Sequence, residues 1–169
     1  HCISSAASDV YKRQILDKPE FGSQNQQLFT FGIIDMEKLD LQALGLRALN
    51  EKLQKLTDET NQKDWEIVNP RGSHAIAVGV DAAINVTVRG STGYYCGGMN
   101  KQAQINVDGS AGPGVAENMM SGIIIIKGDA SQYAGATGHG GTLVIKGNAS
   151  SRCGLSLIHI SEPTRRRGI

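Results

Sequence analysis

The sequence predicts a mainly β fold, a right-handed parallel β-helix preceded by a short strand and an amphipathic helix. Three observations predict it: four glycines recur every 19 residues, an apolar dyad precedes each of them, and small residues follow each at fixed distances. Self-similarity at such a period is typical of solenoids, in which each repeat is one coil. A period of 19 disfavours left-handed hexapeptide helices, which run on multiples of six, and the Gly-x-Asp pairs of calcium-binding rolls are missing.

The dyads predict a continuous interior. Apolar residues stand four and two positions before each period-setting glycine, and successive strand residues alternate sides, so both members of a dyad face the core. The dyads are Val86 with Val88, Ile105 with Val107, Ile124 with Ile126, and Leu143 with Ile145. We expect the glycine after each dyad to turn a corner at backbone angles closed to other residues, and the small residues three and seven positions later to let the wall bend. The predicted structural corner glycines are Gly90, Gly93, Gly97, Gly109, Gly112, Gly128, Gly135, Gly147 and Gly154.

An N-terminal arm over residues 15–64 precedes the predicted β-helix, which covers residues 65–154. Within this arm, residues 28–36 (LFTFGIIDM) have the β-branched and aromatic content of a short strand. Leu46, Leu49, Leu53 and Leu56 recur at three- and four-residue steps, which predicts a helix over about 43–56 with one apolar face. This helix is expected to dock on another part of the protein.

The two ends, residues 1–14 and 155–169, resemble translated sequencing-adaptor text and are set aside as artefacts. The formal net charge of +1 then becomes −2, because five basic and two acidic residues are removed from 17 and 16. The repeat agrees, since the next corner glycine is due at Arg166. We therefore expect further native coils beyond this sequence, and an unpaired last coil that makes the chain prone to associate.

Composition and charge exclude several classes of function. The remaining chain has no basic stripe for nucleic acid, and no apolar run reaches the roughly 18 residues of a membrane span. Three scattered cysteines are too few for a disulfide scaffold, so a cytoplasmic location is expected. No nucleic acid or membrane is therefore expected among the partners.

None of the candidate chemical motifs predicts a catalytic, cofactor-binding or metal site on this chain. The glycine clusters at 90–98, 109–114 and 135–141 match neither the P-loop nor the dinucleotide fingerprint, and they obey the coil period. Cys96 and Cys153 share a coil position but stand three coils, roughly 14 Å, apart, too far for a disulfide. His74 and His139 have no thiol or carboxylate at ligand spacing.

Two outward-facing columns are informative. Arg89, Asp108, Lys127 and Lys146 share the position before the corner glycine, which predicts a surface charge ladder. A second face is polar in the first two coils but carries Ile123, Ile125 and Val144 in the third and fourth. These three residues form a candidate partner surface, and cover by the N-terminal helix is the competing interpretation.

The amino-acid sequence of the repeats resembles that of a known family. The stretches VNPRGSHAIAVGV (68–80), VRGSTGYYCGGMNK, DGSAGPGVAENMMSG, KGDASQYAGATGHGG and VIKGNASSRCG are similar to the small β-helical subunit of N-methylglutamate synthase-type complexes. In turn, this family is equivalent to the C-terminal GXGXG β-helix domain of the glutamate synthase large (alpha) subunit. The β-helical subunit of formylmethanofuran dehydrogenase is a more distant relative. The resemblance covers residues 28–154, with Ala116, Ser131 and Ser150 in place of family glycines.

The resemblance implies a non-catalytic scaffold within an enzyme complex. A glutaminase-like subunit and a synthase subunit with FMN and an iron–sulfur cluster would be its partners, with methylamine and glutamate as substrates of the whole complex. No catalytic or cofactor residue of that family maps onto this chain. A formylmethanofuran dehydrogenase scaffold and a stand-alone carbohydrate-active β-helix stay as alternatives.

Overall fold

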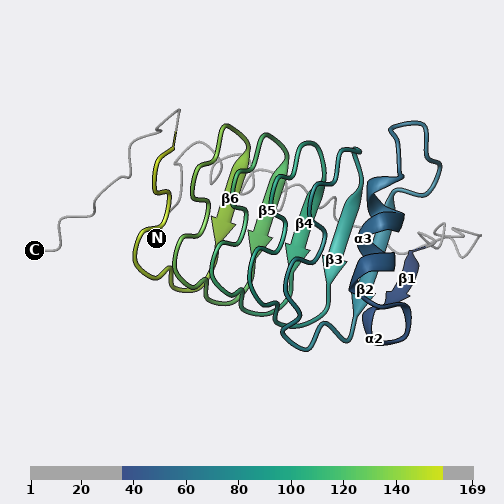
Figure 1. The fold of residues 1–169 in the computed structure, drawn as a ribbon, viewed down its shortest axis with the longest axis horizontal. Coiled ribbons are helices and arrows are strands. Elements are labelled where there is room, and N and C mark those ends of the chain that lie inside the picture. The colour runs from purple at the N-terminus through teal and green to yellow at the C-terminus, as the bar shows by residue number, and fades with distance from the viewer. Residues whose placement is uncertain (1–35, 158–169) are drawn as a thin grey trace, which may run out of the picture.

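The computed structural model describes residues 36–157, which form a β-solenoid of about four turns with six parallel strands (Figure 1). The strands lie side by side in chain order, so the prediction of a parallel β-helix is confirmed. Both adaptor-like ends, apart from residues 155–157, and the predicted strand, apart from Met36, lie outside the described residues. The elements are β1 (Glu37–Asp40), α2 (Leu41–Leu44), α3 (Leu46–Gln54), β2 (Asp64–Val68), β3 (Asn85–Val88), β4 (Gln104–Val107), β5 (Ile123–Ile126) and β6 (Thr142–Ile145).

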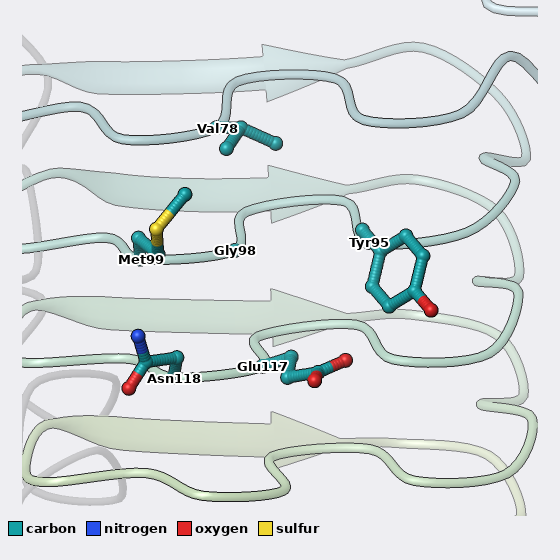
Figure 2. A pocket seen from close by; sticks show the side chains of 6 residues that line it. All are labelled: Val78, Tyr95, Gly98, Met99, Glu117 and Asn118. Carbon is teal, nitrogen blue, oxygen red and sulfur yellow. The ribbon is translucent and has the colours of Figure 1, made fainter.

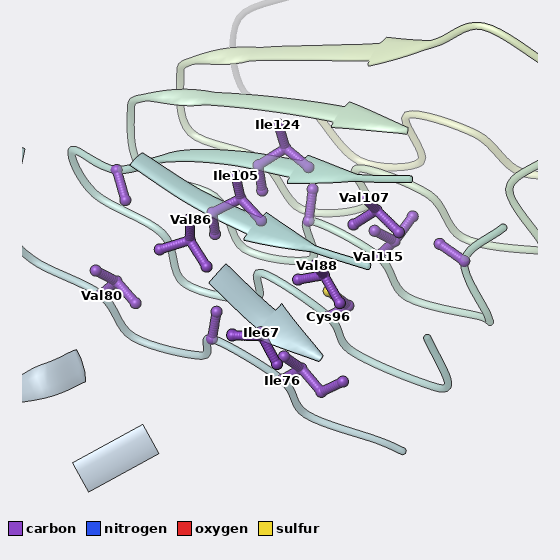
Figure 3. Packing of buried hydrophobic residues seen from close by; sticks show 14 of the residues in the cluster. Ile67, Ile76, Val80, Val86, Val88, Cys96, Ile105, Val107, Val115 and Ile124 are labelled. Atoms are coloured by element: carbon purple, nitrogen blue, oxygen red, sulfur yellow. The ribbon is translucent and has the colours of Figure 1, made fainter. Parts of the chain in front are cut away.

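The apolar dyads line up in the interior as the period predicts. Val88 pairs with Val107, Val107 with Ile126, and Ile126 with Ile145, and each is at most 1% exposed. The first dyad members stack in the same way, although Leu143 at the end of this file is only partly buried. Figure 3 shows the dyad members of β3 and β4, together with Ile124 of β5, on the inside of the coils. Because each file contains only branched apolar residues, each coil buries its apolar face on the next.

The first coil departs from the 19-residue period. Asn85 of β3 stands opposite Asp64 of β2, 21 residues earlier, whereas β3 and all later strands keep intervals of 19. The register of the strands is nevertheless preserved, so Trp65 and Ile67 point into the same core as Val86 and Val88. The extra residues lie outside the sheet and leave the interior unchanged.

The reason for the corner glycines differs from the one expected. Only Gly90 of the four has a left-handed backbone, with φ of 132°. At Gly109 a Cβ would stand 2.6 Å from the backbone of Gly90 and Ser91, and at Gly128 and Gly147 it would stand less than 3 Å from the preceding coil's backbone. The expectation of special backbone angles is thus wrong for three of the four. Close approach of successive coils excludes a side chain there.

Left-handed residues instead alternate along the turn wall, the segment that follows each corner. In each coil three residues, each separated from the next by one residue, have φ between 52° and 71°. They are Ala75, Ala77 and Gly79; Tyr95, Gly97 and Met99; Gly114, Ala116 and Asn118; Tyr133, Gly135 and Thr137; and Arg152, Gly154 and Ser156. The left-handed conformation costs a non-glycine residue roughly 1–2 kcal/mol. Hydrogen bonds between coils oppose that cost, because the N–H of Tyr95 donates to the next coil and that of Gly97 to the preceding one.

The middle residue of each alternating set faces the core, and this explains the small residues seven positions after the corner. A Cβ on Gly97 would stand 2.7 Å from Cδ1 of Ile124. Ala116, at the same position one coil later, is fully buried. The flanking positions face outward, which is why tyrosine, methionine and arginine side chains are accommodated there.

A polar ladder that the sequence analysis missed joins the coils just after the corner. The hydroxyl of Ser91 accepts a hydrogen bond from the backbone N–H of Ser110, and that of Ser110 accepts one from Asp129. The carboxylate of Asp129 accepts one from Asn148 at 2.7 Å. The signal was present in the sequence as a short acceptor side chain after every corner glycine.

The N-terminal helix caps the open end of the stack. It begins earlier than expected and is broken at Gly45, which has φ of 80° and separates α2 from α3, and it ends at Gln54. Leu49 and Leu53 are fully buried in the core cluster. The side-chain amides of Asn50 and Gln54 donate to the carbonyls of Ala75 and Val78 in the first coil, at 2.7 and 2.8 Å.

The Gln54 contact replaces one that the other coils make with each other. The carbonyl of Gly98, which has the place of Val78 one coil later, accepts from the backbone N–H of Gly79 in the preceding coil. The first coil has no preceding coil of this kind, and the glutamine side chain supplies the missing donor. The helix therefore closes both the apolar interior and the hydrogen-bond ladder at this end.

Replacement of a corner glycine by alanine should destabilise the protein. In Gly109→Ala the new Cβ would overlap backbone atoms of the preceding coil. We expect the free energy of unfolding in urea to fall by about 1–3 kcal/mol. Gly138→Ala is the matched control, since its φ is not left-handed and its nearest neighbour is the flexible end of Leu157 at 3.2 Å. Equal losses for the two variants would contradict the close-approach explanation.

Truncation of the helical cap should also destabilise the whole stack. Leu53→Ala removes a fully buried side chain, and large-to-small core substitutions of this kind cost about 2–5 kcal/mol. Leu44→Ala is the control, because Leu44 is 40% exposed. Thermal unfolding followed by circular dichroism checks the difference. A Leu53→Ala variant as stable as the control would show that the cap adds nothing.

Candidate functional site

The candidate partner surface lies on the outer face of the strand wall, over β5 and β6. Ile123 is 39% exposed, and Ile125 and Val144 are partly exposed. Ile125 pairs with Val144 across the two strands, as the period requires. Asn106 lies beside Ile125 on the other side, where the polar half of the face begins. One face of a single sheet thus changes from polar to apolar along the stack.

The N-terminal helix does not cover this apolar strip. Its polar side chains contact the first coil, and its leucines belong to the core next to β2. Figure 1 shows α3 beside β1 and β2, with β3 and β4 between it and the strands of the strip. The interpretation of the strip as a docking site for that helix is therefore wrong. The strip of Ile123, Ile125 and Val144 therefore stays a candidate partner surface.

The charge ladder forms over Arg89, Asp108 and Lys127, and Glu66 of β2 joins it. The carboxylate of Asp108 accepts from Arg89 of the preceding coil and from Lys127 of the next, the latter at 2.6 Å. Arg89 also donates to Glu66 of β2, at 2.6 Å. The Asp108 side chain is 18% exposed, so this network is partly shielded from solvent. It is a stabilising contact between coils, and its carboxylates are engaged by cations.

The pKa of Asp108 reflects two opposing effects. Burial alone would raise the pKa of this carboxyl, but the hydrogen bonds from Lys127 and Arg89 outweigh it and lower the pKa below its ordinary value. The same network raises the pKa of Arg89, chiefly through its hydrogen bonds to Glu66 and Asp108. Asp108 is therefore held as a carboxylate, and the stabilisation is electrostatic.

The glycine clusters use their backbone N–H groups within the fold. Gly93 donates to Ser73, Gly97 to Ile76, and Gly112 to Thr92, all in the preceding coil. A phosphate cradle needs several N–H groups turned toward one free concave site. These three N–H groups instead donate hydrogen bonds to the preceding coil.

Cys96 and His74 take part in the packing of the coils. Val115 and Ala134 occupy the place of Cys96 and Cys153 in the two intervening coils, so the two thiols are not adjacent. Cys96 is fully buried, and burial raises the pKa of its thiol to about 11. His74 stacks on Tyr94 at 4.5 Å and accepts a hydrogen bond from its backbone N–H. Among residues 36–157 no three His, Cys, Asp or Glu side chains gather as a metal site.

An exposed cluster on the turn wall was missed by the sequence analysis. Tyr94, Tyr95 and Met99 are each about half exposed, and Tyr94 and Tyr95 contact edge to face with ring centroids 6.4 Å apart. The signal lay in the coil register, because a position four, five or nine residues after a corner glycine faces outward. Large apolar side chains at those positions mark an exposed surface.

Comparison with known proteins gives one informative match. The chain is 59% identical over 91 residues to Protein GlxC of Rhizobium meliloti (strain 1021). The match covers 54% of this chain, which spans about 40% of that relative's length. No family model matches the sequence, and no solved structure matches it. Within the part of the chain that the structure describes, neither helix has the length and hydrophobicity needed to cross a membrane.

Removal of the Asp108 carboxylate should reduce the dependence of the free energy of unfolding on pH in the acidic range. The lowered pKa means that Asp108 stabilises the fold above the ordinary aspartate pKa, and that this contribution is lost as the pH falls through the lowered value. We expect Asp108→Asn to lose roughly 1 kcal/mol at pH 7 and a smaller amount at pH 3. Urea unfolding at both pH values measures this, with the exposed Glu59→Gln as control. A loss that is the same at both pH values would contradict the ion-pair assignment.

Proposed function

We propose that this chain is a non-catalytic β-helical scaffold in a glutamate-synthase-like complex of the N-methylglutamate synthase type. The observation that carries the proposal is the apolar strip of Ile123, Ile125 and Val144 on a sheet face that is otherwise polar. A scaffold needs a rigid body with an exposed apolar surface for a partner, and this solenoid has both.

The motif resemblance supports the choice of complex. The repeated motifs of the coils are similar to those of the small subunit of such complexes. The chain is also 59% identical to Protein GlxC over 91 residues, and we propose that GlxC is a subunit of the same kind. In this proposal the partners are a glutaminase-like subunit and a synthase subunit. The assembly transfers nitrogen to or from glutamate, with methylamine as the proposed amine and the cytoplasm as the proposed location.

The residues of this chain do not fit the cofactors of that chemistry. FMN requires donors for its phosphate, and the N–H groups of Gly93, Gly97 and Gly112 are engaged in hydrogen bonds between coils. An iron–sulfur cluster needs several thiolates. Cys96 and Cys153 are three coils apart, and the thiol of Cys96 stays protonated because of its burial. We therefore place both FMN and the iron–sulfur cluster on the synthase partner and assign no reaction step to this chain.

The scaffold role can be tested by affinity purification of the tagged chain, co-expressed with the glutaminase-like and FMN-containing subunits of an N-methylglutamate synthase complex. We expect both subunits to co-purify with the chain. In a variant with Ile125→Asp and Val144→Asp, recovery should fall at least tenfold, because carboxylates in the strip must be desolvated on binding.

Thr87→Asp with Asn106→Asp is the matched control, since these residues occupy the same outward column in the polar half of the face. Circular dichroism confirms that both variants keep their strands. Equal loss of partners in the two variants would refute the role of the strip. Isolation of the chain alone as an active glutamate-forming enzyme would refute the scaffold proposal itself.

A further inference from the structure

A gap in one outward file of side chains creates a hollow on the turn wall. The position eight residues after the corner carries Val78, Glu117, Ala136 and Leu155 in four coils but Gly98 in the second. Gly98 is not left-handed, so its backbone does not require glycine. A Cβ there would meet no atom closer than the Tyr95 carbonyl oxygen, at 3.3 Å. The absence of a side chain at Gly98 therefore creates a hollow, although the backbone conformation there does not require glycine.

The hollow has a volume of about 370 Å³ and walls of mixed chemistry. Figure 2 shows Tyr95 on one side of Gly98 and Met99 on the other, with Val78 on the preceding coil and Glu117 and Asn118 on the next. The Tyr95 ring and the Glu117 carboxylate converge, because both have an atom within 2.8 Å of the point where a Cβ of Gly114 would stand. An aromatic ring and a carboxylate side by side are the two groups that attract a flat cation.

The polar groups of the hollow have no partners within the described fold. No hydrogen bond or ion pair joins the Glu117 carboxylate, the Tyr95 hydroxyl or the Asn118 side-chain amide to residues 36–157. Most other carboxylates on the solenoid are engaged, as Asp108 is by Arg89 and Lys127. The hollow therefore offers one net negative charge, one aromatic ring and one amide to an external ligand.

The solenoid itself contains a pair that shows which cation suits this tyrosine position. Tyr133 is the equivalent of Tyr95 two coils later, and Arg152 occupies the same position in the coil that follows it. The guanidinium of Arg152 lies 5.3 Å from the Tyr133 ring centroid and donates to the tyrosine hydroxyl. In the coil that follows Tyr95 the same position is Gly114, so Tyr95 has no arginine from its own chain.

We propose that the hollow over Gly98 binds an arginine side chain presented by a partner protein. The guanidinium would contact the Tyr95 ring and pair with Glu117, its aliphatic stem would lie against Met99 and Val78, and Asn118 at the rim would bond the partner's backbone. A guanidinium suits the site better than an ammonium because it both stacks on a ring and binds a carboxylate with two donors. This site lies on the turn wall, away from the apolar strip, and it does not depend on the proposed complex.

The test uses the full 169-residue chain and a short peptide as probe. Binding of the peptide acetyl-Gly-Arg-Gly-amide is followed by two-dimensional ¹H–¹⁵N NMR. Saturable shifts at the Gly98 and Glu117 amides are expected, with at least fivefold weaker binding of the uncharged citrulline peptide. Ethylguanidinium, which lacks a peptide backbone, should bind at least threefold more weakly than the arginine peptide.

Variants of the hollow make the result decisive. Gly98→Leu should abolish binding because it fills the hollow, and Glu117→Gln should weaken it at least fivefold, while Glu59→Gln should leave it unchanged. Unaltered spectra away from the site show that each variant is folded. Absence of saturable shifts, equal binding of the citrulline peptide, or stronger binding of the matching lysine peptide would overturn the arginine assignment. Equal or stronger binding of ethylguanidinium would overturn its assignment to a protein partner.

Discussion

The distance between successive coils governs this structure, and backbone contact at one column of glycines sets that distance. At Gly109, Gly128 and Gly147 the chain passes so close to the preceding coil that a single methyl group would not fit. This contact keeps the parallel strands within hydrogen-bonding distance and brings the inward dyads together. The charge ladder and the polar ladder after the corner also need this spacing, because each of their contacts joins one coil to the next.

Features that repeat with the coil could be predicted from the sequence. A period of 19 determined which residues share a file, so the interior dyads, the contact of Asp108 with Arg89 and Lys127, and the pairing of Ile125 with Val144 all followed from counting positions. The left-handed positions were harder to predict, because Tyr95, Met99 and Tyr133 adopt that conformation without being glycine. Hydrogen bonds between coils impose it, and such bonds have no local signature in the sequence.

Features that occur once were predicted less well. The apolar stripe of the helix indicated that it docks, but not that it docks on the open end of the first coil, since a stripe of leucines carries no information about its partner. The 21-residue first interval and the break at Gly45 were likewise invisible to a repeat analysis. The hollow over Gly98 escaped notice for the opposite reason. Gly98 was considered only as part of the glycine cluster at 90–98, whereas its place in a file of side chains shows that a side chain is absent there.

The helical cap gives the stack a direction. Because it is the N-terminal end that is sealed, by Leu49, Leu53 and the Gln54 amide, a chain emerging from the ribosome completes its foundation before any 19-residue coil is made. Each later coil can then pair with the exposed backbone N–H and C=O groups of the coil before it. The coils are therefore synthesised in the order in which they lie on the capped end.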